Sequence, residues 1–122
     1  MNAFTTDPRY AAGLALFNQQ RFFEAHEVLE DVWRETSGEA RLFLQGVVQA
    51  AVGLHHLSQR NLVGAVGVLS RALGNLSGYP EQYGRINLGG FREALAGCLE
   101  ALAAEREPVT PKIERDGPAA GA

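Results

Sequence analysis

Apolar side chains recur every three or four positions along most of the chain, which is the spacing of one face of an α-helix. Sustained alternation of apolar and polar residues, the signature of a half-buried strand, is not apparent. The pattern predicts an all-α protein of about five helices in antiparallel hairpins, packed as a compact helical bundle. The predicted helices span residues 7–18, 22–35, 39–58, 62–76 and 90–105.

Local signals support several of these boundaries. Asp7 and Pro8 suit a helix cap and a first helical position, Asn61 suits the cap of the fourth helix, and Gly38 follows the end of the second. The third helix is apolar nearly all round, which is typical of a central and buried helix. We expect a loop over 78–87 between the last two helices.

Beyond position 106 the helical pattern stops, and the sequence is rich in Pro, Gly and charged residues. This segment contains too little apolar material to pack against a core. The prediction is a single helical domain over 1–106, followed by an extended or mobile C-terminal tail over 107–122.

A weak internal repeat has an offset of 40 residues, because residues 16–33 can be laid over 56–73. At this offset Gly13 falls on Gly53, and other small and large residues also coincide. Such spacing resembles tetratricopeptide-like helical hairpins, although their usual period is about 34 residues.

Glycines are frequent inside the third and fourth predicted helices. Each one costs roughly 1 kcal/mol relative to alanine, so their number predicts close helix packing. They form two stripes, one of Gly46 and Gly53 with Ala50, and one of Gly64, Gly67 and Gly74.

The composition of the 122 residues is that of an ordinary globular protein, with 46% hydrophobic and 20% charged residues. A formal charge of −3 without a basic stripe argues against nucleic acid as a partner. We expect no membrane partner, because apolar runs are broken well before about 18 residues, and the start of the chain lacks a secretion signal. Cys98 shares an apolar stripe, so core packing is expected rather than catalysis. Together these features favour a cytoplasmic protein.

The second predicted helix carries polar residues beside its apolar stripe. His26 and Glu30 are four positions apart and therefore lie on one side, with Trp33 continuing that side and Glu27 bordering it. The remaining acidic residues of this helix, Glu24, Asp31 and Glu35, are expected to form a solvated face together with Glu27.

The third predicted helix contributes two amides and two imidazoles. Gln45, Gln49 and His56 share one face, and His55 lies about 100° away. Burying such groups unpaired costs roughly 1 to 3 kcal/mol each, so we expect partners from the second helix. The resulting prediction is a polar pocket between helices two and three, made of His26, Glu27, Glu30, Trp33, Gln45, Gln49 and either His55 or His56.

Two segments carry a family resemblance. These are Phe23-Glu24-Ala25-His26-Glu27, followed by Glu30 and Trp33, and the segment Phe43-Leu44-Gln45-Gly46-Val47-Val48-Gln49-Ala50-Ala51. The sequence resembles the small helical bacterial and archaeal proteins called domain of unknown function 309, over about residues 10–75. The resemblance implies an all-helical bundle and a site, but no reaction.

Three interpretations of the polar cluster stay open. His26, Glu30 and His56 could hold a metal such as zinc or iron, although neither the zinc-protease nor the di-iron spacing is present and a bound metal is not favoured over none. His26 could serve as the general base of a hydrolytic or other small-molecule site, although no nucleophile stands out. The cluster could also be purely structural, in a helical-hairpin protein–protein interaction module or homo-oligomer. In each case His26→Ala is expected to cost roughly 1 to 3 kcal/mol.

Overall fold

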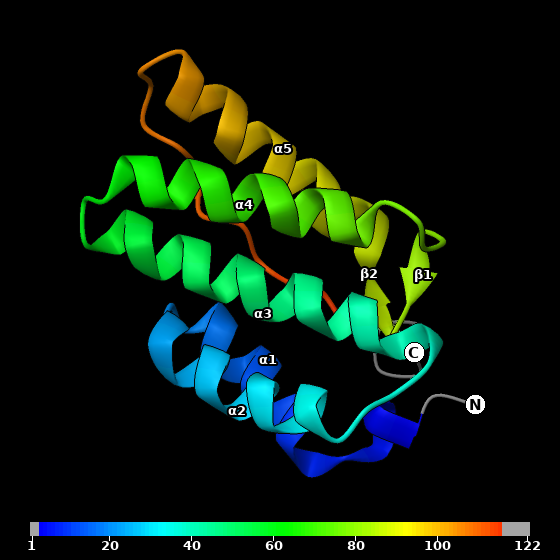
Figure 1. Ribbon diagram of the computed structural model, residues 1–122. Helices are drawn as coiled ribbons and strands as arrows, with labels where there is room; N and C mark the ends of the chain where they lie inside the picture. The colour runs from blue at the N-terminus through cyan, green and yellow to red at the C-terminus, as the bar shows by residue number, and fades with distance from the viewer. Residues whose placement is uncertain (1–2, 116–122) are drawn as a thin grey trace.

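The computed structural model describes residues 3–115 of the chain. Within that range, five α-helices follow one another as packed neighbours (Figure 1). A short 3-10 helix, η1, precedes them, and a small β-hairpin joins the last two helices. The predicted all-α fold of about five helices is confirmed. The elements are η1 (Ala3–Thr6), α1 (Pro8–Asn18), α2 (Phe22–Arg34), α3 (Glu39–Ser58), α4 (Leu62–Leu76), β1 (Gln82–Tyr83), β2 (Ile86–Asn87) and α5 (Leu88–Ala103).

Side-chain caps set the start of three helices. The Asp7 carboxylate accepts a hydrogen bond from the amide of Arg9, and the Asn61 side chain accepts one from the amide of Gly64, as the sequence predicts. The helix α5 begins at Leu88, two residues earlier than expected, because Asn87 is its cap. The β-hairpin was not predicted, since strands of two residues are too short to show alternation.

The helix α3 lies between α2 and α4 and forms the centre of the core (Figure 1). Half of its residues are buried, in agreement with the prediction of a central helix. Although α3 is strongly apolar, no helix within residues 3–115 is both long enough and apolar enough to cross a membrane.

Cys98 of α5 is also buried, and burial raises the pKa of its thiol, which disfavours the nucleophilic thiolate. Its predicted place in the core is confirmed.

In both helical hairpins, α1–α2 and α3–α4, a glycine of the first helix faces a leucine of the second. A Cβ added to Gly13 of α1 would lie 2.5 Å from Leu29 Cγ of α2, and one added to Gly53 of α3 would lie 2.6 Å from Leu69 Cγ of α4. Both glycines therefore let a leucine of the partner helix approach the backbone. Both pairs also obey the 40-residue offset seen in the sequence.

The turns inside the two hairpins are equivalent as well. Gln20 and Arg60 have left-handed backbones with φ of 64° and 63°. In each turn the next amide donates to the carbonyl five positions earlier, at 3.0 and 2.9 Å. This is the hydrogen bond that ends a helix in the Schellman motif. The repeat is thus one of hairpin geometry, and a tetratricopeptide-like character is not confirmed.

The β-hairpin is held on the core by aromatic side chains. The Tyr10 hydroxyl, fully buried, donates a hydrogen bond to the Gly84 carbonyl at 2.6 Å. Gly84 has a φ of 63°, and a Cβ there would lie 2.7 Å from Phe43 Cζ. Only glycine fits this position without strain.

The segment after α5 is extended and runs back behind α4 and α3 toward the β-hairpin (Figure 1). The expectation that it contains too little apolar material to pack is wrong for its described part, because Pro111 and Ile113 are buried. One well-placed isoleucine is sufficient to hold an extended segment when its backbone is also hydrogen-bonded. Residues 116–122 of the predicted tail lie outside the described range.

Candidate functional site

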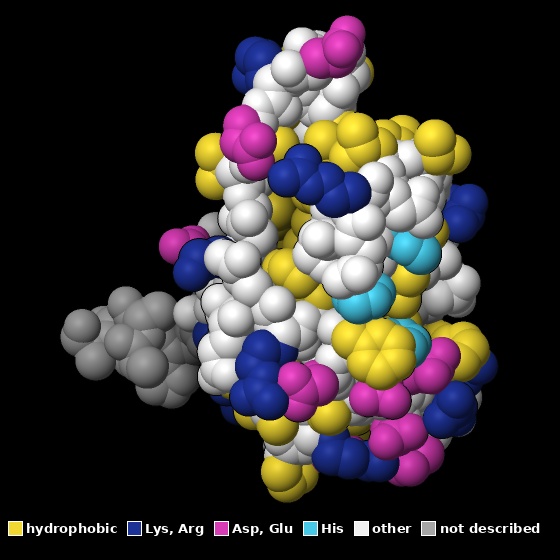
Figure 2. All heavy atoms as spheres, turned by 90° about the vertical axis from the view of Figure 1, so that its left-hand side faces the viewer, with side chains coloured by type: hydrophobic (Ala, Val, Ile, Leu, Met, Phe, Trp, Pro, Cys, Tyr) yellow, Lys and Arg dark blue, Asp and Glu magenta, His cyan; other side chains and the backbone are white. Residues whose placement is uncertain are grey.

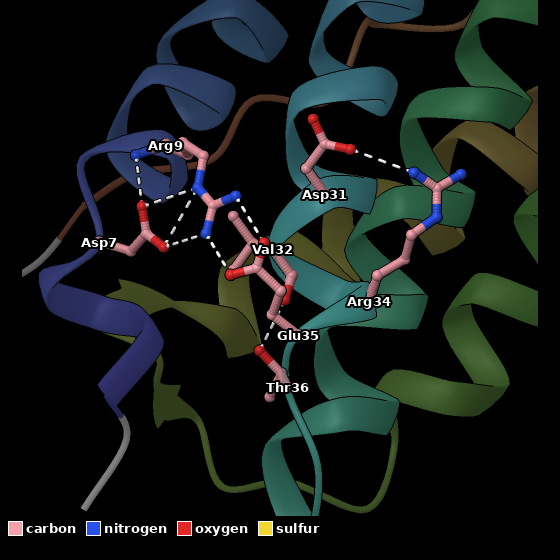
Figure 3. A network of polar contacts seen from close by, with 7 residues as sticks. All are labelled: Asp7, Arg9, Asp31, Val32, Arg34, Glu35 and Thr36. Carbon is pink, nitrogen blue, oxygen red and sulfur yellow. Dashed lines mark hydrogen bonds and ion pairs between the residues drawn. The ribbon is translucent and has the colours of Figure 1, made fainter.

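His26 and Glu30 lie side by side on α2, as their spacing predicts. His26 Nε2 is 3.8 Å from Glu30 Oε1, and Arg34 Nη2 donates to the same oxygen at 3.1 Å. Arg34 also binds Asp31 from its other terminal nitrogen (Figure 3). The side chains of His26 and Glu30 are 23% and 31% exposed. Glu30 is therefore paired within its own helix, in a place that water reaches.

An aromatic contact joins this cluster to α3. The Phe23 ring lies between two imidazoles, with centroid distances of 5.6 Å to His26 and 5.4 Å to His55. Figure 2 shows the histidines gathered on one face of the molecule with a hydrophobic side chain among them. Of the two neighbouring histidines of α3, His55 is thus the one beside the α2 cluster.

The glutamine face of α3 points toward α4 rather than α2. Asn75 Nδ2 of α4 donates to Gln49 Oε1 at 2.7 Å, and His56 Nδ1 lies 3.3 Å from Nδ2 of Asn61, the α4 cap. Gln49 and His56 are only about 20° apart around the helix axis, so both reach the same neighbour. The structure therefore places the predicted site residues on two different flanks of α3.

The physical premise of the predicted pocket does not hold. The prediction assumed that α3 has no side open to water, but Leu42 is 45% exposed and Gln45, Gln49 and His56 are only half-buried. Among residues 3–115 no histidine, amide or charged residue is fully buried, and Glu27 is exposed. The cost of unpaired buried groups therefore does not force α2 and α3 to form a polar pocket.

Trp33 lies at the other end of the α2–α3 interface. The Arg41 guanidinium carbon is 4.1 Å from the centre of the indole ring, and its Nη1 donates to the carbonyls of Trp33 and Thr36. Arg41 thus caps the end of α2 while it stacks on the indole. The Trp33 Nε1 atom is buried and has no hydrogen-bond acceptor within residues 3–115.

The predicted metal ligands do not meet as one group. Within residues 3–115 no three His, Cys, Asp or Glu side chains are arranged so that they could hold a metal ion. His26 and Glu30 adjoin each other, whereas His56 contacts Asn61 on the α4 side. Binding of zinc or iron by His26, Glu30 and His56 stays a prediction without geometric support.

The open end of the first hairpin is closed by an ion-pair network (Figure 3). Arg9 of α1 binds Asp7 at 2.7 Å and Glu35 at 2.8 Å. The hydrogen bonds from Arg9 lower the pKa of both carboxyl groups. At the 40-residue offset Arg9 corresponds to Gln49 and Glu35 to Asn75, so the amide pair of the second hairpin occupies the place of this ion pair.

The equivalent helices α2 and α4 differ most on their outer faces. Arg71 is the single charged residue of α4, whereas α2 carries several acidic residues and Arg34. On α4 the side chains of Val63 and Val66 are 88% and 40% exposed. At about 100° per residue they share an arc with small residues. We call this arc the α4 outer face, and it consists of Val63, Val66, Gly67, Ser70 and Gly74.

Two glycines of the α4 outer face have no close packing partner within residues 3–115. A Cβ on Gly74 would meet nothing within 4 Å, and one on Gly67 would meet only the Arg71 guanidinium at 3.9 Å. By contrast, a Cβ on Gly46 of α3 would lie 2.7 Å from Leu76 Cγ. The prediction that helical glycines permit close packing is therefore confirmed for α3 but not for this face of α4. The sequence of α4, in which Arg71 is the single charged residue, was the available signal for this surface.

Comparison with known proteins finds a family match over most of the two hairpins. The sequence profile described as Domain of unknown function (DUF309) matches residues 10–68, which is just under half of the chain. The chain is similar to the DUF309 family over this stretch. The resemblance inferred from the two sequence motifs is thereby confirmed. The DUF309 match runs from within α1 to within α4, so it includes the His26 cluster and the first half of the α4 outer face.

Two bacterial proteins, both uncharacterised, are similar to this chain. One, from Aquifex aeolicus (strain VF5), is 32% identical over 84 residues, which cover 68% of this chain and 25% of the relative. The other, YpuF from Bacillus subtilis (strain 168), is 34% identical over 53 residues, which cover 43% of this chain and 30% of the relative. The chain thus matches less than a third of the length of either relative.

Proposed function

We propose that this domain is a protein-interaction module that associates through the α4 outer face, with a second copy of the chain as its partner. The observation that carries the proposal is an exposed, uncharged helix face with two helical glycines against which no other element of residues 3–115 packs closely. Each such glycine destabilises an isolated helix by roughly 1 kcal/mol relative to alanine. A partner backbone that packs closely at Gly67 and Gly74 supplies a physical reason for both.

The chemistry of the face suits a symmetric contact. A two-fold interface brings the same patch of both copies together, so the patch must be complementary to itself. A charged face such as the outer side of α2 would repel its own copy. The α4 outer face is apolar or neutral at each of its positions, with Arg71 at its margin.

The size of the face limits the strength of the contact. A helix of 15 residues is about 22 Å long, and a strip about 10 Å wide covers roughly 220 Å² per partner. Stable interfaces bury about 800 Å² per partner. The dimer formed by this chain alone is therefore weak, with a Kd of roughly 0.1 mM or above.

The polar cluster supports the interaction role better than a catalytic one. Gln49 pairs with Asn75, Glu30 with Arg34, and His56 lies beside Asn61. These partners account for the polar side chains as parts of the scaffold. A module that forms part of longer chains also agrees with the short share of each relative that this chain matches.

Sedimentation velocity over a concentration series from about 10 µM to about 1 mM tests the proposal. The wild-type chain should show self-association, and Val63→Glu should weaken it at least about tenfold by placing two like charges in the contact. The matched control is Phe23→Glu, because Phe23 occupies the corresponding position of α2 at the 40-residue offset and is also exposed, at 52%. A wild-type chain that stays monomeric throughout, or equal association of the two variants, contradicts the proposal.

A further inference from the structure

We propose that the groove which holds residues 109–115 is a binding site for an extended segment of another protein, and that the chain's own tail occupies it as an internal ligand. We call residues 109–115 the strap. The partner segment has the chemistry of the strap itself: an extended backbone with a proline two positions before an aliphatic side chain. This site is separate from the α4 outer face.

The strap lies in the groove as a bound peptide does. Pro111 and Ile113 are buried, with Ile113 only 1% exposed, whereas Lys112 and Glu114 between and after them are exposed. Inward and outward side chains thus alternate, as expected for an extended segment on a surface. A single aliphatic side chain provides most of the apolar anchoring.

The groove binds the backbone of the strap through both of its hydrogen-bonding groups. Asn18 Nδ2 of α1 donates to the Ile113 carbonyl at 2.8 Å, and the Ile113 amide donates to Asn18 Oδ1 at 2.8 Å. One asparagine side chain therefore satisfies both polar backbone groups of one residue. Such contacts depend on extended geometry and not on the identity of the side chain.

Strand pairing extends the same contact. The Asn87 amide donates to the Glu114 carbonyl at 2.8 Å, and Ile86 of β2 forms an antiparallel bridge with Arg115. The strap therefore adds a strand to the edge of the β-hairpin. Strand addition of this kind is a common way for a domain to bind an extended peptide.

The strap does not fill the groove completely. A cavity of about 400 Å³ lies between it and α5, lined on the helix side by Ala94, Gly97 and Cys98. A Cβ on Gly97 would meet nothing within 4 Å. A segment with larger side chains at the positions before the proline would gain contacts here that the strap lacks.

A second cavity adjoins the beginning of the tail. It has a volume of about 550 Å³, and its lining combines apolar side chains, such as Leu57, Leu62 and Leu102, with polar and charged ones, such as Arg60 and Glu105. Figure 2 shows this hollow below the projecting end of α5, with hydrophobic side chains on its floor. The groove therefore offers room on the amino-terminal side of the strap as well.

The covalent link to α5 makes the strap a strong competitor. An attached segment on a short linker has an effective concentration in the millimolar range. A free peptide of the same sequence should therefore bind the wild-type chain only at comparable concentrations. Weakening the internal strap should make the groove accessible.

The direct test is the binding of a fluorescent peptide of residues 107–115 to the full-length chain, measured by fluorescence anisotropy. Replacing Ile113→Ser in the protein should tighten peptide binding at least about tenfold, because the internal strap loses its anchor. Adding Asn18→Ala to this variant should reverse the gain. Lys112→Ser is the matched control, since Lys112 is exposed in the same segment, and it should bind the peptide like the wild type.

Two further outcomes make the test decisive. The proposal is overturned if Asn18→Ala does not change peptide binding. It is also overturned if the Ile113→Ser protein is folded, as judged by circular dichroism, but binds no peptide.

If Ile113→Ser does not fold, hydrogen exchange of the wild-type chain tests the proposal instead. The amides of Ile113 and Asn87 should exchange together, at least about 100-fold faster than the amides of α3, because the strap opens locally. Equal protection of all three shows that the strap is a permanent part of the core and overturns the proposal. Val63→Glu should leave peptide binding unchanged, which separates this test from that of the α4 outer face.

Discussion

The hairpins α1–α2 and α3–α4 are built on one plan but present different surfaces. Inside, Gly13 faces Leu29 in the first hairpin, and Gly53 faces Leu69 in the second. Outside, α2 carries acidic side chains paired with arginines, whereas α4 carries valines, glycines and one arginine. The two hairpins therefore share their internal packing, and they differ chemically on the outer face of the second helix of each.

The contacts that close the open ends of the two hairpins also occupy corresponding positions and also differ in chemistry. The first hairpin uses the ion pair Arg9–Glu35, and the second uses the amide pair Asn75–Gln49 at the corresponding positions. The two pairs occupy corresponding positions, but one is an ion pair and the other is a hydrogen bond between neutral amides. Gln49 accepts from Asn75 of α4 and therefore does not join the histidine cluster.

The largest expected effect comes from removing the leucine that fills each hairpin. Leu29 and Leu69 are fully buried, so Leu29→Ala and Leu69→Ala should each destabilise the fold by about 2 to 5 kcal/mol. Chemical denaturation measures both free energies of unfolding. A cost below about 1 kcal/mol for either variant would show that the two hairpins are not packed alike.

The glycines give a smaller effect whose sign should differ within the molecule. Gly13→Ala and Gly53→Ala should destabilise by about 1 to 3 kcal/mol, because the new Cβ clashes with a leucine. The controls Gly67→Ala and Gly74→Ala should stabilise the monomer by up to about 1 kcal/mol, through helix propensity. Thermal unfolding at low protein concentration distinguishes the two signs. Destabilisation by Gly74→Ala would reveal an internal packing role that the structure does not show.

His26 should contribute less to stability than the sequence alone suggests. The sequence-based value of roughly 1 to 3 kcal/mol assumed that the substitution strands buried partners. In the structure Glu30 keeps Arg34 as a partner and both His26 and Glu30 are partly exposed, so His26→Ala should cost less than about 1 kcal/mol. Urea denaturation of this variant beside Phe23→Ala, which removes the ring between the two histidines, measures the difference. A loss above about 2 kcal/mol would restore the buried-network interpretation.

The smallest effect is a pH response confined to the first hairpin. Hydrogen bonds from Arg9 lower the pKa of Asp7 and Glu35, so their stabilisation is present above the usual carboxyl pKa and is lost as the pH falls through the lowered values. Between about pH 4 and pH 2 the end of α2 should therefore loosen, while the Asn75–Gln49 contact should not respond. Amide exchange followed by NMR compares the two ends. Equal loosening of both would remove the distinction.

Local features of the fold were predictable from the sequence, and relations between distant segments were not. Asp7 and Asn61 accept hydrogen bonds from amides two and three residues later, so their capping roles can be predicted from the local sequence. The 40-residue offset was also visible, because Gly13 and Gly53 repeat. The burial of Ile113 was not predictable, since its partner Asn18 lies 95 residues earlier.

The candidate site was only partly predictable for a similar reason. Helical spacing correctly places Gln49 and His56 on one face of α3, and His26 with Glu30 on one face of α2. Spacing does not say which neighbouring helix each face meets, and the glutamine face meets α4. The open glycines of α4 were misassigned to internal packing because a sequence shows a glycine but not what stands opposite it.

The most direct test of the account compares equivalent positions of the two hairpins. Phe23 and Val63 correspond at the 40-residue offset, and both are exposed, at 52% and 88%. Sedimentation equilibrium of the wild type, Phe23→Glu and Val63→Glu at about 1 mM chain measures the association constant of each. The account predicts that Val63→Glu weakens self-association at least about tenfold while Phe23→Glu leaves it intact. An equal loss in both variants, or no association in the wild type, would contradict it.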